Sequence, residues 1–240
     1  MPTRREFLTG LAVTPLAAYL PVLEPDLTVR AEIWPEDHCL SAESALGFRQ
    51  LLASVAGDGS VSSRASASLI IVPGVRQLSF ASGATLLERM HLGAWVIFES
   101  GLGFSTEAKY RRQAEVCERI FDLKLLPPIK VTKHLARTAY IEYFRPIGCL
   151  VRTFEAVTPV CCDRSEVVAK FAGYTVCTRK TIGCGGLIYL GSMLGPGLFA
   201  EEREAVKVGS ALVAAGRNVA AIVQRGSFLI QPGLLSRDSR

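Results

Sequence analysis

Residues 68–104 limit the possible folds of this chain more than any other part of the sequence. They contain two short runs, residues 69–72 and 95–98, in which every residue is apolar and most are β-branched or aromatic. Such runs are typical of strands that are buried on both faces of a parallel sheet. A Pro-Gly break and a short helical span separate the two runs, so the stretch predicts a β-α-β unit.

The ends of these two strands are where a site is expected. In open parallel sheets, ligands bind just beyond the carboxyl ends of the strands. Pro73-Gly74 follows the first strand, and Glu99-Ser100-Gly101 follows the second. We therefore expect a shallow crevice there. Its candidate ligand-binding residues are Gly74, Val75, Glu99, Ser100, Gly101 and Ser192.

The flanking sequence extends the alternation of strands and helices. Residues 29–34 predict a first strand, Ser41 is a candidate N-cap for the helix that follows, and Ser105 is a candidate N-cap for a helix after the Gly-rich corner. From Ile129 onward, short strands are separated by Gly and Pro. The glycines of residues 180–186 predict a hairpin turn. We therefore expect an α/β domain with a parallel sheet that ends in antiparallel strands.

The N-terminus has the layout of an export signal. Residues 3–8 read Thr-Arg-Arg-Glu-Phe-Leu, and a moderately apolar segment follows to about residue 20. This resembles the twin-arginine signal and predicts an exported protein of the periplasm or cell envelope. We divide the chain into an export signal or N-terminal anchor (1–24), an α/β domain (25–224) and a C-terminal tail (225–240). The alternative for the first segment is a basic N-terminus followed by a buried helix.

Composition restricts the class of partner. The net charge of +5 is spread over the chain without a cluster of Lys and Arg interleaved with aromatic residues, which argues against nucleic-acid binding. We expect an unidentified small molecule or protein as partner. Membrane contact is expected only through the N-terminal segment, if it is not cleaved. The sequence indicates no cofactor.

Two groups of residues carry a resemblance to a known family. The first is LIIVPG, followed by a helix and by an apolar strand that runs into the Glu-Ser-Gly corner; the second comprises residues 173–176 and 182–192. Together they resemble the class I glutamine amidotransferase-like superfamily, and residues 182–192 are similar to a strand pair of its non-catalytic members. The resemblance implies a flavodoxin-like three-layer sandwich. Its sheet would be mainly parallel, with antiparallel strands in the C-terminal half.

The resemblance also implies that the catalytic residues of that family are missing. The elbow pattern Gly-x-Cys-x-Gly falls on residues 97–101, which places Glu99 where the nucleophilic cysteine would stand. The loop at residues 191–195, which would supply the histidine that activates the thiol, contains none. The three histidines, His38, His91 and His134, all precede it. We therefore expect a non-catalytic binding or assembly module.

Other functions stay open. Ser100 as a nucleophile, or Glu99 as a general base, would make the chain a hydrolase or amidase, with His134 as the histidine that returns to the strand ends. Glu99 is alternatively a structural carboxylate that accepts hydrogen bonds from loop amides. A third reading is a structural subunit of a larger exported complex that docks through residues 225–240.

The cysteines offer one candidate group for a disulfide or a metal site. The chain has seven cysteines but no Cys-x-x-Cys pair, and its three histidines are scattered. Cys161, Cys162 and Cys184 are the one grouping that we consider for a disulfide or a metal.

Overall fold

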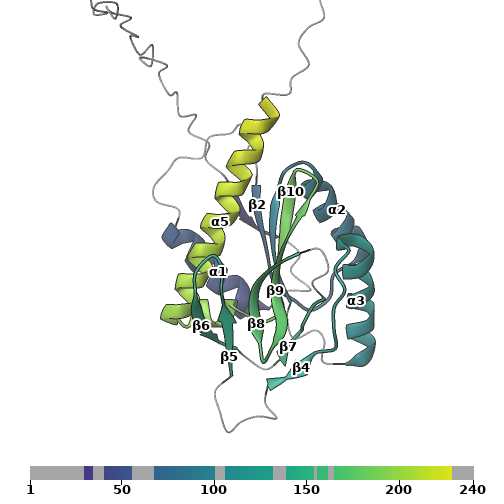
Figure 1. Ribbon diagram of the computed structural model, residues 1–240, viewed down its shortest axis with the longest axis vertical. Coiled ribbons are helices and arrows are strands. Elements are labelled where there is room, and N and C mark those ends of the chain that lie inside the picture. Colours follow the sequence, from purple (N-terminus) through teal and green to yellow (C-terminus); the bar gives the residue numbers. More distant parts are fainter. Residues whose placement is uncertain are drawn as a thin grey trace, which may run out of the picture.

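The computed structural model describes residues 30–34, 41–55, 68–100, 106–131, 139–153, 156–161 and 165–228 (Figure 1). The predicted export signal and His134 lie outside these residues. The helices in this part of the chain are α1 (Ala42–Val55), α2 (Phe80–His91), α3 (Glu107–Phe121), α4 (Gly195–Phe199) and α5 (Arg203–Phe228). The strands are β1 (Arg30–Ile33), β2 (Ser68–Val75), β3 (Trp95–Ser100), β4 (Ile129–Lys130), β5 (Tyr140–Tyr143), β6 (Cys149–Arg152), β7 (Ala156–Val157), β8 (Glu166–Phe171), β9 (Tyr174–Ile182) and β10 (Gly185–Leu190).

Eight of these strands form one sheet in the order β1-β2-β3-β10-β9-β8-β5-β6. The pairings β1–β2, β2–β3 and β3–β10 are parallel, whereas β10–β9, β9–β8, β8–β5 and β5–β6 are antiparallel. Strands β4 and β7 form a separate two-stranded sheet. The prediction of a flavodoxin-like three-layer sandwich with a mainly parallel sheet is therefore wrong, because four of the seven pairings are antiparallel.

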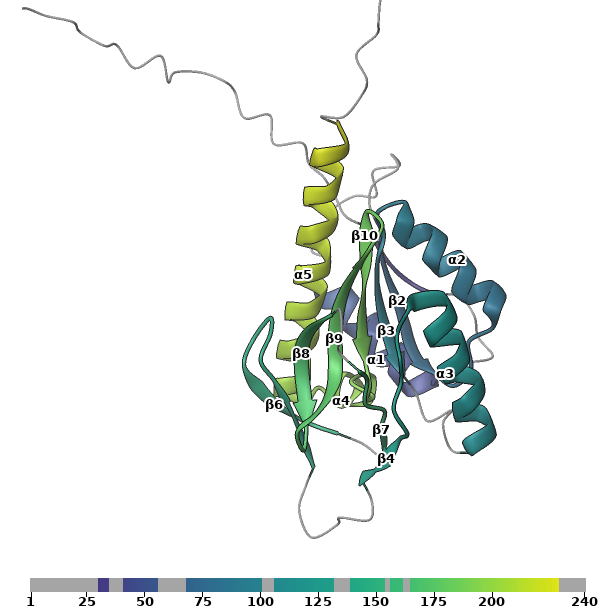
Figure 2. The ribbon, with the colours of Figure 1, turned by 45° about the vertical axis from the view of Figure 1, so that its right-hand side comes forward.

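The large sheet is buried on both faces in its parallel half. Helices α1, α4 and α5 pack on one face, with Phe48, Leu198 and Leu212 in the core between them and the strands. Helices α2 and α3 cover the other face, where Leu86 and Phe121 belong to a second core. Figure 2 shows α5 and α3 on opposite sides of β10. The two-sided burial explains why β2 and β3 are continuously apolar.

Several predicted elements are confirmed, with shifted boundaries. Helix α1 begins directly after Ser41, as expected. The N-cap of α3 is Thr106 rather than Ser105, which lies outside the described residues; the Thr106 side chain accepts a hydrogen bond from the amide of Lys109. Helix α5 continues to Phe228, so the first four residues of the expected C-terminal tail are helical. None of the helices in the described ranges is both long and apolar enough to cross a membrane.

The predicted hairpin joins β9 and β10. Its turn contains Gly183 with φ +58°, a conformation that glycine adopts without steric cost. Gly185 is needed for a different reason, because a Cβ there would lie 1.9 Å from the carbonyl oxygen of Ala94. The glycine therefore lets β10 enter the sheet next to β3.

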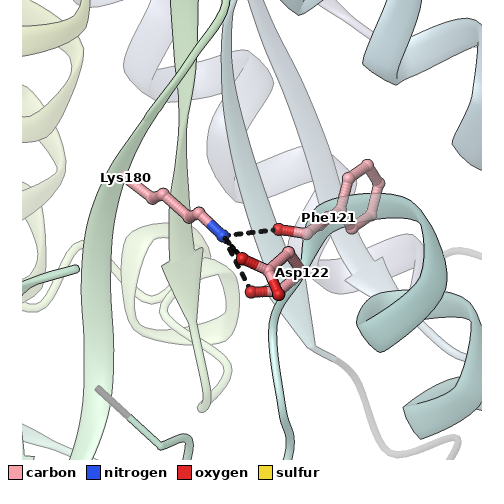
Figure 3. A network of polar contacts seen from close by, with 3 residues as sticks. All are labelled: Phe121, Asp122 and Lys180. Carbon is pink, nitrogen blue, oxygen red and sulfur yellow. Dashed lines mark hydrogen bonds and ion pairs between the residues drawn. The ribbon is translucent and has the colours of Figure 1, made fainter. Parts of the chain in front are cut away.

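A lysine on β9 connects the antiparallel half of the sheet to α3. The Nζ of Lys180 donates hydrogen bonds to the carbonyl oxygens of Phe121 (3.1 Å) and Asp122 (2.8 Å) and to Oδ2 of Asp122 (2.7 Å), as Figure 3 shows. Asp122 is the C-cap of α3 and has φ +49°. A positive charge at this position satisfies carbonyl groups that the helix leaves unpaired and interacts favourably with the helix dipole.

We expect the carbonyl bonds of Lys180 to matter more than its ion pair. Lys180→Met should lower the free energy of unfolding by about 2 kcal/mol, because charged hydrogen bonds at a mostly buried site are lost. The matched control Asp122→Asn should cost about 0.5 kcal/mol or less, because the aspartate side chain is 76% exposed and asparagine also tolerates a positive φ. Urea unfolding measures both values. Equal losses would contradict this assignment.

Candidate functional site

The described crevice residues do meet at the carboxyl ends of the parallel strands. Gly74 and Val75 end β2, Glu99 and Ser100 end β3, and Val75 pairs with Ser100 in the sheet. Ser192 follows the carboxyl end of the neighbouring β10. Gly101 lies outside the described residues. All five described residues are buried, so the part of the predicted crevice that they form is filled by protein.

The carboxylate of Glu99 fills the centre of this region. It has no exposed surface, and both of its oxygens accept hydrogen bonds. Oε2 accepts from the hydroxyl of Ser44 in α1 and from the amide of Gly74 at 2.6 Å. Oε1 accepts from the amides of Leu194 at 2.5 Å and Gly195 at 2.7 Å. One side chain thus connects β3 to α1, to the end of β2 and to the start of α4.

Two glycines allow this close packing. Gly74 has φ +51°, and a Cβ there would lie 2.6 Å from the Cβ of Ser41. A Cβ on Gly195 would lie 1.9 Å from the hydroxyl oxygen of Ser44. In both places a side chain would push α1 away from the strand ends. The glycines therefore let the backbone amides and the serine come within hydrogen-bonding distance of Glu99.

Burial and hydrogen bonding act on the pKa of Glu99 in opposite directions. Removal from water raises the pKa of this carboxyl above its ordinary value, because the charged form loses its hydration. The bonds from Ser44, Gly195, Gly74 and Leu194 lower the pKa, because they favour the charged form. Burial is the larger effect, so the pKa of Glu99 is raised overall. The folded protein therefore binds this proton more tightly than the unfolded chain.

Ser100 does not have the surroundings of a nucleophile. It is 3% exposed, and its side chain is a hydrogen-bond partner of the Tyr189 hydroxyl. That hydroxyl also donates to the carbonyl oxygen of Thr158 at 3.2 Å. Burial raises the pKa of Tyr189 well above its ordinary value, so the phenol keeps its proton and cannot act as a base near neutral pH.

The described histidine is at the wrong end of the strands to assist Ser100. His91 is the last residue of α2, and its carbonyl accepts a hydrogen bond from the amide of Cys184 in the β9–β10 turn. This turn lies at the amino end of β10, which runs parallel to β3. The length of β3, about 17 Å, therefore separates His91 from Ser100. His38 and His134 lie outside the described residues.

The candidate metal cysteines are not brought together. Cys161 follows Val160, whose amide bonds to the carbonyl of Thr175 near the start of β9, while Cys184 follows the end of that strand. Cys162 lies outside the described residues. Within the described ranges, no group of three His, Cys, Asp or Glu residues is placed to hold a metal ion.

Of the four partners of Glu99, Gly74 was among the candidates drawn from the sequence, and the other three were not. Ser44 lies in α1, while Leu194 and Gly195 lie at the start of α4, and both helices are distant from β3 in sequence. A weak signal existed at Ser44, since a small polar residue lies on the apolar face of α1 next to Phe48.

Comparison with solved structures finds chains that this one resembles to different degrees. An exo-β-1,4-mannosidase from Opitutaceae bacterium strain TAV5 matches with a TM-score of 0.55 at 14% identity, over 78% of this chain and 36% of that chain. A cytoplasmic protein from Salmonella typhimurium LT2 matches with a TM-score of 0.53 at 10% identity, over 72% of this chain and 86% of that one. A β-galactosidase from Bacillus circulans sp. alkalophilus gives a TM-score of 0.45 at 11% identity, over 66% and 22% of the two chains.

These likenesses concern the fold alone. The chain spans about a third of the length of the mannosidase. The match to the mannosidase, together with the mixed sheet, overturns the expected flavodoxin-like sandwich. The sequence matches no protein-family model. It also matches no curated protein.

The raised pKa of Glu99 predicts a specific pH dependence of stability. The unfolded chain releases this proton near pH 4.5, whereas the folded protein holds it to higher pH. The stability that the protonated carboxyl contributes is therefore present below pH 4.5 and is lost as the pH rises through the folded pKa.

We expect the free energy of unfolding of wild type minus that of Glu99→Gln to be largest at pH 4.5 and below, and to shrink as the pH rises through the folded pKa. Glutamine cannot titrate, and taking the difference cancels the other titrating groups. Urea unfolding at a series of pH values measures it. A difference that grows with pH would mean that the four hydrogen bonds outweigh burial.

Proposed function

We propose that this chain is a non-catalytic module whose role is assembly with other protein rather than chemistry at the strand ends. The observation that supports this proposal is the state of Glu99: its carboxylate is fully buried and both oxygens are occupied by protein donors. A general base must reach the proton that it removes from a substrate. A carboxylate that is already surrounded by donors is better suited to hold structural elements together.

The second candidate is a hydrolase that uses Ser100 or Glu99. It draws support from the likeness to the exo-β-1,4-mannosidase, and the non-catalytic proposal draws none from that likeness. Glycoside hydrolysis needs two carboxyl groups about 5–9.5 Å apart. Ser100 is 3% exposed, and its side chain is a hydrogen-bond partner of Tyr189. These surroundings are the reason for placing the hydrolase second.

The family of this chain is the subject of a third proposal, separate from the non-catalytic module and from the hydrolase. We propose a non-catalytic relative of the class I glutamine amidotransferase-like superfamily on the basis of the resemblance of residues 68–104, 173–176 and 182–192. Glu99 in place of the nucleophilic cysteine is the residue on which that proposal depends.

A probe that reacts with any activated serine tests the non-catalytic proposal without knowledge of the substrate. We expect the full chain to resist labelling by a fluorophosphonate and to release no nitrophenol from p-nitrophenyl β-mannoside, β-galactoside or acetate above the buffer rate. The buried, hydrogen-bonded Ser100 is the physical reason. Mass spectrometry and absorbance measure the two results.

The matched variants are Ser100→Ala and Ser192→Ala, since both serines are buried at neighbouring strand ends. Turnover or labelling that drops at least tenfold in Ser100→Ala, but not in Ser192→Ala, would establish the hydrolase and overturn the non-catalytic proposal. The urea midpoints of both variants show whether each is folded.

We also propose that the N-terminal segment directs export by the twin-arginine route. Residues 1–30 fused to a fluorescent reporter should send it to the periplasm of a bacterial host. Replacing Arg4 and Arg5 with lysine keeps the charge but removes the paired guanidinium groups, so we expect most of the export to be lost. Fractionation of the cells measures it. Equal export by both fusions would contradict a twin-arginine signal.

A further inference from the structure

Each oxygen of the Glu99 carboxyl group has two hydrogen-bond partners. Oε1 contacts the amides of Leu194 at 2.5 Å and Gly195 at 2.7 Å, while Oε2 contacts the amide of Gly74 at 2.6 Å and the hydroxyl of Ser44. A carboxyl oxygen offers two lone-pair sites. These four contacts fill all the sites of the group, so a proton that binds to Glu99 must lie along one of them.

Three of the four partners are unable to accept that proton. A backbone N–H group is a donor only. A proton on Oε1 would point at the amide hydrogen of Leu194 or Gly195, and a proton on Oε2 that is directed at Gly74 would also meet an amide hydrogen. Each of these placements brings two donors together. Ser44 is different, because its hydroxyl group rotates and offers lone pairs as well as a hydrogen.

We infer that Ser44 accepts the proton of Glu99, so that the hydrogen bond between α1 and β3 reverses its direction with pH. When the carboxyl group is charged, the hydroxyl of Ser44 donates to Oε2. When Glu99 has bound a proton from solvent, Oε2–H donates to Oγ of Ser44. The serine hydrogen then turns toward a carbonyl one helical turn earlier, which is the usual alternative for a helical serine.

The surroundings of Glu99 favour the neutral form that this reversal needs. Its contacts with α1, the end of β2 and the start of α4 are made by one hydroxyl and three amides, so none of them supplies a charge. Burial raises the pKa of Glu99 above its ordinary value. From β5, Tyr143 interacts electrostatically with Glu99. Burial raises the pKa of Tyr143 well above its ordinary value, so the phenol stays neutral while Glu99 titrates.

The reversal makes Ser44 a pH-sensitive contact that holds in both protonation states. A residue that only donates would oppose the protonated carboxyl group, and a residue that only accepts would oppose the charged one. A hydroxyl group does neither, because its hydrogen can point toward Oε2 or away from it. We therefore expect α1 to stay bonded to β3 below and above the folded pKa of Glu99.

This inference goes beyond the proposed non-catalytic function and does not depend on it. If Ser44 does not accept the proton, the reversal is wrong, and the non-catalytic proposal is unaffected. Turnover or labelling at Ser100 would overturn the non-catalytic proposal and leave the contact between Ser44 and Glu99 untouched.

Infrared spectroscopy of the full chain tests the reversal directly. As the pH falls through the folded pKa, a C=O band of a protonated carboxyl group should appear in wild type and be missing in Glu99→Gln. In Ser44→Ala this band should move to higher frequency, because the O–H group loses its acceptor. The matched control is Ser192→Ala, a buried serine at the end of the neighbouring β10, which should leave the band in place. A band that Ser44→Ala does not shift would overturn the inference.

Amide hydrogen exchange in wild type gives a second test that does not depend on the folding of any variant. The amides of Leu194 and Gly195 should keep their protection factors on both sides of the folded pKa, because the proton lies on Oε2 and not on Oε1. Loss of protection at either amide on protonation would place the proton on Oε1 and overturn the inference. Absence of the Glu99 band at every pH at which the chain stays folded would overturn it as well.

Discussion

The buried carboxylate of Glu99 is the interaction on which the arrangement of this fold depends. Four donors from three other elements converge on it, and none of them is close to Glu99 in sequence. If the carboxylate were removed, the amides of Gly74, Leu194 and Gly195 would be buried without an acceptor, which is more costly than the loss of the bonds themselves. One acidic side chain therefore helps to hold α1 and α4 over the strand ends, together with the apolar packing of Phe48 and Leu198.

This interaction also affects the chemistry that is available at the strand ends. A carboxylate that satisfies four donors is held in place, while Ser100 next to it is committed to Tyr189. The region has the topology of a ligand site, yet its polar groups are paired with one another. Proteins that share a fold often differ in this way, because a site is made by particular side chains and not by the fold that carries them.

The sequence predicted the elements more reliably than their arrangement. Strands β2 and β3 were recognisable because burial on both faces leaves a continuous apolar run, and the β9–β10 hairpin because its turn needs glycine. The balance of parallel and antiparallel pairing was missed. Strand β5 alternates exposed and buried residues, the mark of a half-covered antiparallel strand, but four residues are too few to separate this pattern from a parallel edge.

The position of β10 between β3 and β9 has a consequence for how the chain folds. Strands β8, β9 and β10 are joined by tight turns, so their pairing needs only contacts that are near in sequence. The pairing of Trp95 on β3 with Gly186 on β10 instead closes a loop of about ninety residues. Contacts between residues so far apart in sequence are slow to form. We therefore expect the pairing of β3 with β10 to limit the rate of folding. Quenched-flow labelling would test this by showing whether the amides of β9 are protected before those of β3.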